Sequence, residues 1–341
     1  ADPPRSLGLV PIDPETGQLE LPVSVDGSPG KLAIAGQGRY LYVALDGGAR
    51  VLRYDTVNRA AGLEFSADTG SGASDVTDMA VMPGHPESVA LSLAPAADQP
   101  GGTVWRGSAG IVLFDNGVPR LDFAPGASSL AFLDSTRLYG YDAGTGFRRM
   151  SVDAAGVTVD DATPGLISGA SVRIQYDQGL LLTTSGQVID PEARELLGRF
   201  SGVGAGAAMA ADVEHGRVYY LIPGSSVSRV VAFDPKSLLP VRFWEISGFQ
   251  EAAGYLIRWG QERSDGGGLA FVSEGRVYLL NFSQLDHHPV VFYLSSDADT
   301  SHRLPGGLPI TVQVELTAPA PADGVTLQLS SSDPSIATVP A

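Results

Sequence analysis

The chain has 341 residues and a formal net charge of −16, and 43% of its residues are hydrophobic while 18% are charged. This composition predicts a sizeable folded core, and the negative charge disfavours phosphate backbones and anionic lipids, so nucleic acid is not an expected partner. The sequence has no cysteine, which excludes disulfides and thiolate chemistry, and no apolar run long enough for membrane insertion.

A short apolar strand that ends in Asp or Asn recurs seven times along the chain. In chain order the copies are Leu9–Asp13, Val51–Asp55, Ile111–Asp115, Met150–Asp153, Gln187–Asp190, Val230–Asp234 and Val277–Asn281. Consecutive copies end 37 to 60 residues apart. About 40–45 residues is the length of one four-stranded propeller blade.

Other strand types recur around these copies in a fixed order. Small-residue strands precede aromatic ones, as in Ser129–Leu133 before Thr136–Tyr141, and in Ala207–Asp212 before Gly216–Leu221. Small residues suit strands crowded around a central channel, and aromatic residues suit strands packed between blades. We therefore expect Tyr42, Tyr139, Tyr219 and Phe271 at equivalent, buried positions of the second strands.

These patterns predict an all-β protein in which residues 1–285 form a β-propeller of seven repeat units. Two unrelated β-sandwiches would also give short strands, but they would not repeat one order of strand types. The first unit supplies two strands and the last supplies three, so the blade number stays open. Either Leu19–Val25 completes the last unit and makes six blades, or residues preceding this chain complete a seventh.

The propeller units resemble a known family in their short sequence motifs. Leu41-Tyr42-Val43-Ala44 and Ile12-Asp13-Pro14-Glu15-Thr16-Gly17 are similar to the YVTN-type repeats of bacterial and archaeal surface proteins. The resemblance covers about residues 6–283. It implies a secreted or cell-surface location and no known catalytic activity.

Residues 286–341 are interpreted as a linker and the N-terminal part of an Ig-like β-sandwich. Val314–Leu327 and Leu329–Pro334 are similar to bacterial Ig-like modules that follow such propellers. This length provides three or four strands, whereas an Ig-like sandwich has about seven. We therefore expect the chain to be incomplete at both ends. The module would continue past Ala341 or be completed by another protein subunit through self-assembly.

No catalytic residue and no cofactor are predicted. Asp68-Thr69-Gly70 matches an aspartic-protease motif, but that chemistry needs a second carboxylate and the sequence has no second copy. The Gly-rich segment Gly202–Gly206 could suggest a dinucleotide-binding loop, but no predicted helix follows it to direct its N-terminus at a phosphate. The adjacent His287 and His288 would point to opposite faces of a strand and would not share one metal.

Pairs of acidic residues are the sites considered for Ca²⁺. They are Asp75 with Asp78, Asp160 with Asp161, and Asp297 with Asp299. None of these pairs shows the complete pattern of a calcium loop, and solvated turns are the favoured interpretation. The presence of a metal site is left undetermined.

Arg258 and Trp259 are the candidate contacts for a ligand in the channel, because they belong to the innermost strand of the last unit. The favoured alternative packs Trp259 between blades with Arg258 at the rim. The sequence therefore favours a non-enzymatic structural or adhesive module that mediates protein–protein interaction. The alternative is a small-ligand-binding or lactonase-like enzyme that uses the channel.

Overall fold

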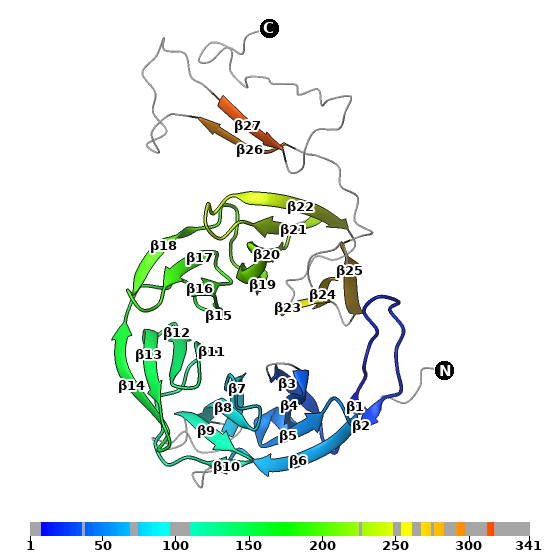
Figure 1. Cartoon of the computed structure of the whole chain (residues 1–341), viewed down its shortest axis with the longest axis vertical. Coiled ribbons are helices and arrows are strands. Elements are labelled where there is room, and N and C mark those ends of the chain that lie inside the picture. The colour runs from blue at the N-terminus through cyan, green and yellow to red at the C-terminus, as the bar shows by residue number, and fades with distance from the viewer. Residues whose placement is uncertain are drawn as a thin grey trace.

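The computed structural model describes residues 8–35, 38–68, 74–95, 110–224, 227–247, 254–260, 267–273, 276–282, 291–296 and 312–316. Five four-stranded antiparallel sheets and one three-stranded sheet surround a common centre (Figure 1). Two 3-10 turns, η2 (Asp46–Gly48) and η3 (Val213–His215), also lie in this part of the chain. The architecture is a six-bladed β-propeller, which confirms the predicted fold and sets the blade number at six.

The strand nearest the centre comes first in each blade. The innermost strands are β3 (Pro29–Ile34), β7 (Ser74–Val81), β11 (Ser129–Phe132), β15 (Ile174–Asp177), β19 (Ala208–Asp212) and β23 (Leu256–Trp259). Ala208 and Ala210 are buried, whereas Ile34 and Ile257 are largely exposed. Small side chains therefore pack in the seams, the contact regions between neighbouring blades. Some large apolar side chains of the same strands remain open to solvent.

The second strands carry large buried side chains in the blade interior. They are β4 (Tyr40–Leu45), β8 (Ser88–Pro95), β12 (Arg137–Asp142), β16 (Leu180–Thr183), β20 (Arg217–Ile222) and β24 (Gly268–Ser273). Tyr42, Tyr139, Tyr219 and Phe271 are 1%, 0%, 8% and 2% exposed, which confirms their predicted burial. The Tyr42 hydroxyl donates to the Pro86 carbonyl of the next blade at 2.9 Å.

The recurring Asp or Asn terminates the third strand of each blade. The third strands are β5 (Arg50–Asp55), β9 (Gly110–Asp115), β13 (Gly146–Val152), β17 (Gln187–Asp190), β21 (Val227–Phe233) and β25 (Arg276–Asn281). In β5, the Asp55 carboxylate accepts hydrogen bonds from the Val57 and Asn58 amides at 3.0 and 2.9 Å. Such side-chain-capped turns explain why Asp recurs at this position.

The outer strands are less regular than the inner ones. They are β6 (Ala60–Ser66), β10 (Val118–Pro119), β14 (Val157–Thr163), β18 (Glu195–Arg199) and β22 (Pro240–Ser247). Among the described residues, the sixth blade has no fourth strand. The hydrophobic core is divided among the seams, with one cluster of buried side chains between each consecutive pair of the six blades.

Of the two alternatives for closing the ring, completion of the last unit by Leu19–Val25 is right in its six blades and wrong in its strand pairing. This segment folds back on the residues before it: β2 (Val23–Ser24) pairs with β1 (Gly8–Leu9), and Ile12 bridges Leu19. Pairing within the hairpin is favoured over pairing with the last blade because Asp13 caps the intervening turn, where its carboxylate accepts hydrogen bonds from the Glu15 and Thr16 amides. Figure 1 shows this hairpin beside blades 1 and 6.

The hairpin is held mainly by blade 1. Leu9 and Val25 pack against the buried cluster of Val43, Leu45 and Leu52. Arg59 of blade 1 also forms an ion pair with Glu20. The hairpin therefore covers an apolar face of blade 1, where a further blade would otherwise be needed.

The C-terminal part is described only in two strands. β26 (Val291–Ser296) and β27 (Val312–Leu316) form an antiparallel pair. The remaining residues of 286–341, including His287, His288, Asp297 and Asp299, lie outside the described residues. The Ig-like interpretation of this part thus stays a prediction.

Candidate functional site: a polar cavity and a groove on blades 4 to 6

Polar side chains of the innermost strands join neighbouring blades. The Asp78 carboxylate accepts from the Leu130 amide at 2.7 Å, and the Ser129 hydroxyl accepts from the Ile174 amide at 3.1 Å. The Gln175 side-chain oxygen accepts from the Ala211 amide at 3.0 Å. These bonds satisfy backbone groups in the seams, and desolvation raises the pKa of the Asp78 carboxyl.

The same arrangement anchors η3, the turn that follows β19. The Asp177 carboxylate of blade 4 accepts from the Val213 amide at 2.7 Å, and burial raises the pKa of Asp177. Gly216 ends the turn with φ of 68°, a left-handed conformation that glycine adopts without steric cost. The chain thereby reverses between Asp212, which ends β19, and Arg217, which begins β20.

Asp212 is the centre of a charged cluster at the seam of blades 5 and 6. Nε of Arg258 donates to one Asp212 carboxylate oxygen at 2.5 Å, and Nδ1 of His215 donates to the other. The Asp212 side chain is 10% exposed and the Arg258 side chain is 18% exposed. A carboxylate this shielded is stabilised by two partners that donate to its two oxygens.

A polar cavity of about 410 Å³ opens beside this cluster. It is lined by Asp212, Glu214, His215, Arg217, Tyr219 and Arg258. Burial raises the pKa of the Tyr219 phenol, so the phenol stays protonated at neutral pH. The cavity therefore presents two guanidinium groups, one imidazole, one phenol and two carboxylates to a small ligand.

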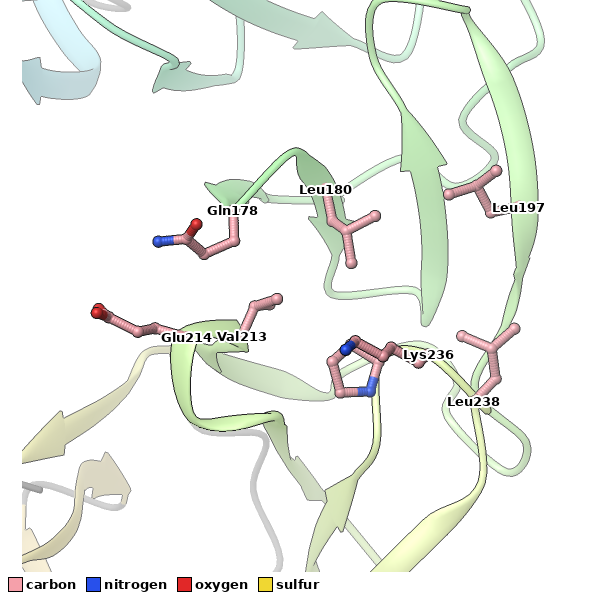
Figure 2. Close-up of a pocket in the computed structure, with 8 residues that line it drawn as sticks. Gln178, Leu180, Leu197, Val213, Glu214, Lys236 and Leu238 are labelled. Atoms are coloured by element: carbon pink, nitrogen blue, oxygen red, sulfur yellow. The ribbon is translucent and has the colours of Figure 1, made fainter. Parts of the chain in front are cut away.

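An apolar groove of about 780 Å³ runs between blades 4 and 5, next to the polar cavity. Figure 2 shows Gln178 and Glu214 at one end of this groove, and Leu197 and Leu238 at the other. Leu180, Val213, Pro235 and Lys236 complete its lining. Glu214 borders both the groove and the cavity, so the two features are contiguous on one face.

Leu238 occupies an unusual backbone conformation in the groove wall. Its φ is 61°, in the left-handed region that favours glycine and costs other residues about 1 kcal/mol. The equivalent position after Asp13 is Gly17, with φ of 70°. At Gly198, across the groove, a Cβ atom would lie 2.2 Å from Leu238 Cδ1. A leucine in this conformation, packed against a glycine, marks the wall as a candidate functional feature.

The structure separates the two residues singled out from the sequence. Arg258 lines the polar cavity, whereas Trp259 is not among its lining residues. Within the described residues, Nε1 of Trp259 is buried without a hydrogen-bond partner. A ligand role for either residue stays a prediction.

The other sequence candidates are spread over the molecule. Asp160 pairs with Arg137 and Asp161 pairs with Arg149, so these carboxylates have cationic partners. Among the described residues, no three His, Cys, Asp or Glu side chains are close enough to hold a metal ion. Asp68 follows the outer strand β6, and the rest of its protease-like motif lies outside the described residues.

Comparison with known proteins supports the fold alone. No family model and no curated protein matches the sequence. A solved structure of BamB from Moraxella catarrhalis matches 86% of this chain and 89% of its own, at 14% identity and a TM-score of 0.47. Dihydro-heme d1 dehydrogenase NirN matches 85% of this chain, at 12% identity and a TM-score of 0.50, and the match spans 64% of NirN.

Hydrazine synthase from Kuenenia stuttgartiensis matches 81% of this chain and 89% of its own, at 13% identity and a TM-score of 0.53. At such low identity, NirN and hydrazine synthase support the assignment as a propeller and nothing finer. Among the residues that the structure describes, no helix has the length and apolarity needed to cross a membrane.

Proposed function

We propose that this chain is a non-enzymatic structural or adhesive module, located outside the cell, that binds a protein partner through the groove between blades 4 and 5. The groove is the observation that carries this proposal. It combines an apolar wall of Leu180, Leu197 and Leu238 with Gln178 and Glu214 at one end, and Lys236 lies beside Leu238. Apolar clefts with a few polar groups at their edges are typical binding sites.

The chemistry of the groove defines the partner. Its apolar end suits a leucine-like side chain, and Glu214 at the opposite end suits a Lys or Arg. The net charge of −16 also favours a basic partner through long-range attraction. The partner is therefore a protein segment that presents an apolar side chain next to a basic residue.

The use of polar side chains in the seams supports a non-enzymatic role. Asp177 holds η3 and Asp212 joins Arg258 to His215, so these carboxylates stabilise blade contacts. The resemblance of the repeats to YVTN-type surface proteins supports the extracellular location. The interpretation of residues 286–341 as part of an Ig-like module adds a second proposed contact, with another protein subunit.

Selection from a displayed peptide library tests the proposal. Peptides selected on the full 341-residue chain should contain an apolar residue beside Lys or Arg, and they should bind Leu197→Asp at least tenfold more weakly. Val57→Asp is the matched control, because Val57 is 74% exposed and lies in blade 1, outside the groove lining. Peptides that bind Leu197→Asp and the unmodified chain equally would refute the proposal.

Leu238→Gly separates binding from folding. Glycine relieves the left-handed strain at this position and removes one wall of the groove. We expect the relief of strain to offset part of the packing that Leu238 loses against the buried cluster between blades 4 and 5, so that the variant stays folded and loses binding of the selected peptides. Binding that survives Leu238→Gly would remove this wall from the interface.

A small anionic ligand in the polar cavity is the second candidate function. Arg217 lines this cavity beside the Asp212–Arg258 ion pair, and its guanidinium favours a carboxylate or phosphate group. Titration with inorganic phosphate tests this idea. We expect binding that Arg217→Met weakens, and an unchanged affinity would reject it.

A further inference from the structure

A third cavity lies on the opposite part of the ring, at the outer edge of the seam between blades 2 and 3. Its volume is about 660 Å³, and it lies between residues 121–125, which lead toward β11, and the outer strand β14. Its lining residues are Leu121, Asp122, Phe123, Ala124, Pro125, Thr145, Arg148, Val157, Thr158, Val159 and Ala162. The cavity is within the usual size range of small-molecule sites, about 300–1,000 Å³.

Arg148 is a buried cation in this cavity wall. It is 3% exposed and is the one charged side chain among the buried polar residues that the structure describes. It occupies the same buried face of β13 as Met150 and Val152, every second residue along the strand, and these two belong to the apolar cluster between blades 2 and 3. A guanidinium group therefore occupies a position where the strand pattern calls for an apolar side chain.

Arg148 donates its hydrogen bonds to uncharged groups. Its terminal nitrogens donate to the carbonyls of Pro125, at 2.9 Å, and Gly126. Nε is buried and has no partner, and no carboxylate of the described residues forms an ion pair with Arg148. Burial lowers the pKa of Arg148 and outweighs the opposing effect of the nearby Asp142 carboxylate, so the loss of water is only partly compensated.

The mouth of the cavity is apolar and open. Leu121 is 86% exposed and Phe123 is 50% exposed, although both are large apolar side chains. Val157 is buried in the wall beneath them. The cavity thus combines a buried cation that forms no ion pair among the described residues with a hydrocarbon surface at its entrance, and Asp122 is the one carboxylate in its lining.

We propose that this cavity binds a small amphiphile with a carboxylate head and an unbranched hydrocarbon chain. The carboxylate lies beside the Arg148 guanidinium, and a local shift of the side chains around the buried Nε–H lets the carboxylate accept from it and pair with the cation. The hydrocarbon chain lies against Leu121 and Phe123 and removes their apolar surface from water. This site is separate from the groove between blades 4 and 5, so either proposal can fail without the other.

Calorimetric titration of the full chain with decanoate tests the site. Decanol, which has the same chain length and no charge, is the matched ligand control. A charge-assisted hydrogen bond to a buried guanidinium should make decanoate bind on the order of tenfold or more tightly than decanol. Equal affinities, or no binding of decanoate, would overturn the proposal.

Variants at the exposed entrance test the apolar contact without endangering the fold. Leu121→Ser combined with Phe123→Ser should weaken decanoate binding on the order of tenfold. Leu21→Ser is the matched control, because Leu21 is 88% exposed and lies in the N-terminal hairpin. A control variant that loses as much binding would show general adsorption and overturn the site.

Arg148→Met tests the cation directly and should abolish the preference for decanoate over decanol. Circular dichroism should show that this variant remains folded, and the entrance variants decide the question if it does not. Binding of an apolar peptide with a free C-terminal carboxylate, in place of decanoate, would assign the cavity to a protein partner and also overturn the proposal.

Discussion

The seams between blades 2 and 3 and between blades 5 and 6 each contain a shielded arginine, in opposite electrostatic settings. Arg258 donates to the Asp212 carboxylate at 2.5 Å, and His215 donates to the same carboxylate. Arg148 donates to two backbone carbonyls and has no carboxylate partner among the described residues. The charges in the seam between blades 5 and 6 are paired with each other. Arg148, in the seam between blades 2 and 3, forms no ion pair among the described residues.

This difference distinguishes an arginine that stabilises the fold from an arginine that is available to a ligand. In the shielded ion pair, both carboxylate oxygens accept hydrogen bonds from protein side chains. The pair needs no ligand, and it joins two blades. A buried cation without an anion costs free energy that an incoming carboxylate would recover. The polar group that is already paired is therefore structural, and the unpaired one marks the ligand site that we infer.

The largest effect is expected from Arg258→Met, which leaves the shielded Asp212 carboxylate with one of its two side-chain partners. We expect the free energy of unfolding to fall by about 2–3 kcal/mol, measured by urea denaturation. Arg229→Met is the matched control, because Arg229 and Glu245 are 58% and 52% exposed, and its cost should stay below about 1 kcal/mol. Equal costs for the two variants would show that the Asp212–Arg258 pair does not lock the seam.

A smaller effect is expected from Arg148→Met. Methionine fills part of the same volume and removes a desolvated charge, which offsets the loss of bonds to Pro125 and Gly126. The free energy of unfolding should change by no more than about 1 kcal/mol. A cost larger than that of Arg258→Met would identify Arg148 as a structural clamp and reverse the comparison.

Asp78→Asn should give a pH-dependent effect that is smaller still. Because burial raises the pKa of Asp78, its stability contribution is present below the unfolded pKa and is lost as pH rises through the folded pKa. Asparagine does not titrate, and its carbonyl oxygen still accepts from the Leu130 amide. The variant should therefore gain stability relative to the unmodified chain between pH 4 and pH 7, as urea titrations at both pH values will show. The opposite slope would mean that Asp78 is stabilised as a carboxylate.

No effect is expected on catalysis. The His215–Asp212 pair and Tyr219 resemble a catalytic arrangement in their residue types, but we expect no hydrolysis of ester, lactone or peptide substrates. Turnover by the unmodified chain that His215→Asn abolishes would contradict a non-enzymatic role. Asp68→Asn is the parallel test of the protease-like motif and should change nothing except the stability of its turn.

The blade architecture was predictable from sequence because it depends on local patterns. Asp55 and its equivalents cap turns within three residues of themselves, and the tyrosines of the second strands follow at fixed positions. The closure of the ring was not predictable in the same way. Leu19–Val25 resembles a fourth strand, but its pairing depends on the competition between the local turn at Asp13 and the distant β25.

The sites were harder to predict, because they join residues that are distant in sequence. The alternation of Arg148 with Met150 and Val152 is a local signal that would have marked a buried cation. Asp212 and Arg258 belong to different blades, and nothing in either strand indicates the other. The groove likewise combines Leu180, Leu197 and Leu238 from two blades, and it exists only once the blades are packed.

Binding at the groove is tested by hydrogen–deuterium exchange on the full chain, with and without a peptide from the displayed library. Backbone amides at 178–180, 213–214 and 236–238, which border the groove between blades 4 and 5, should exchange more slowly when the peptide is bound. Exchange in the N-terminal hairpin and in blade 1 should be unchanged. Protection confined to the innermost strand β23, around Arg258, would instead place the partner in the channel and refute binding at the groove.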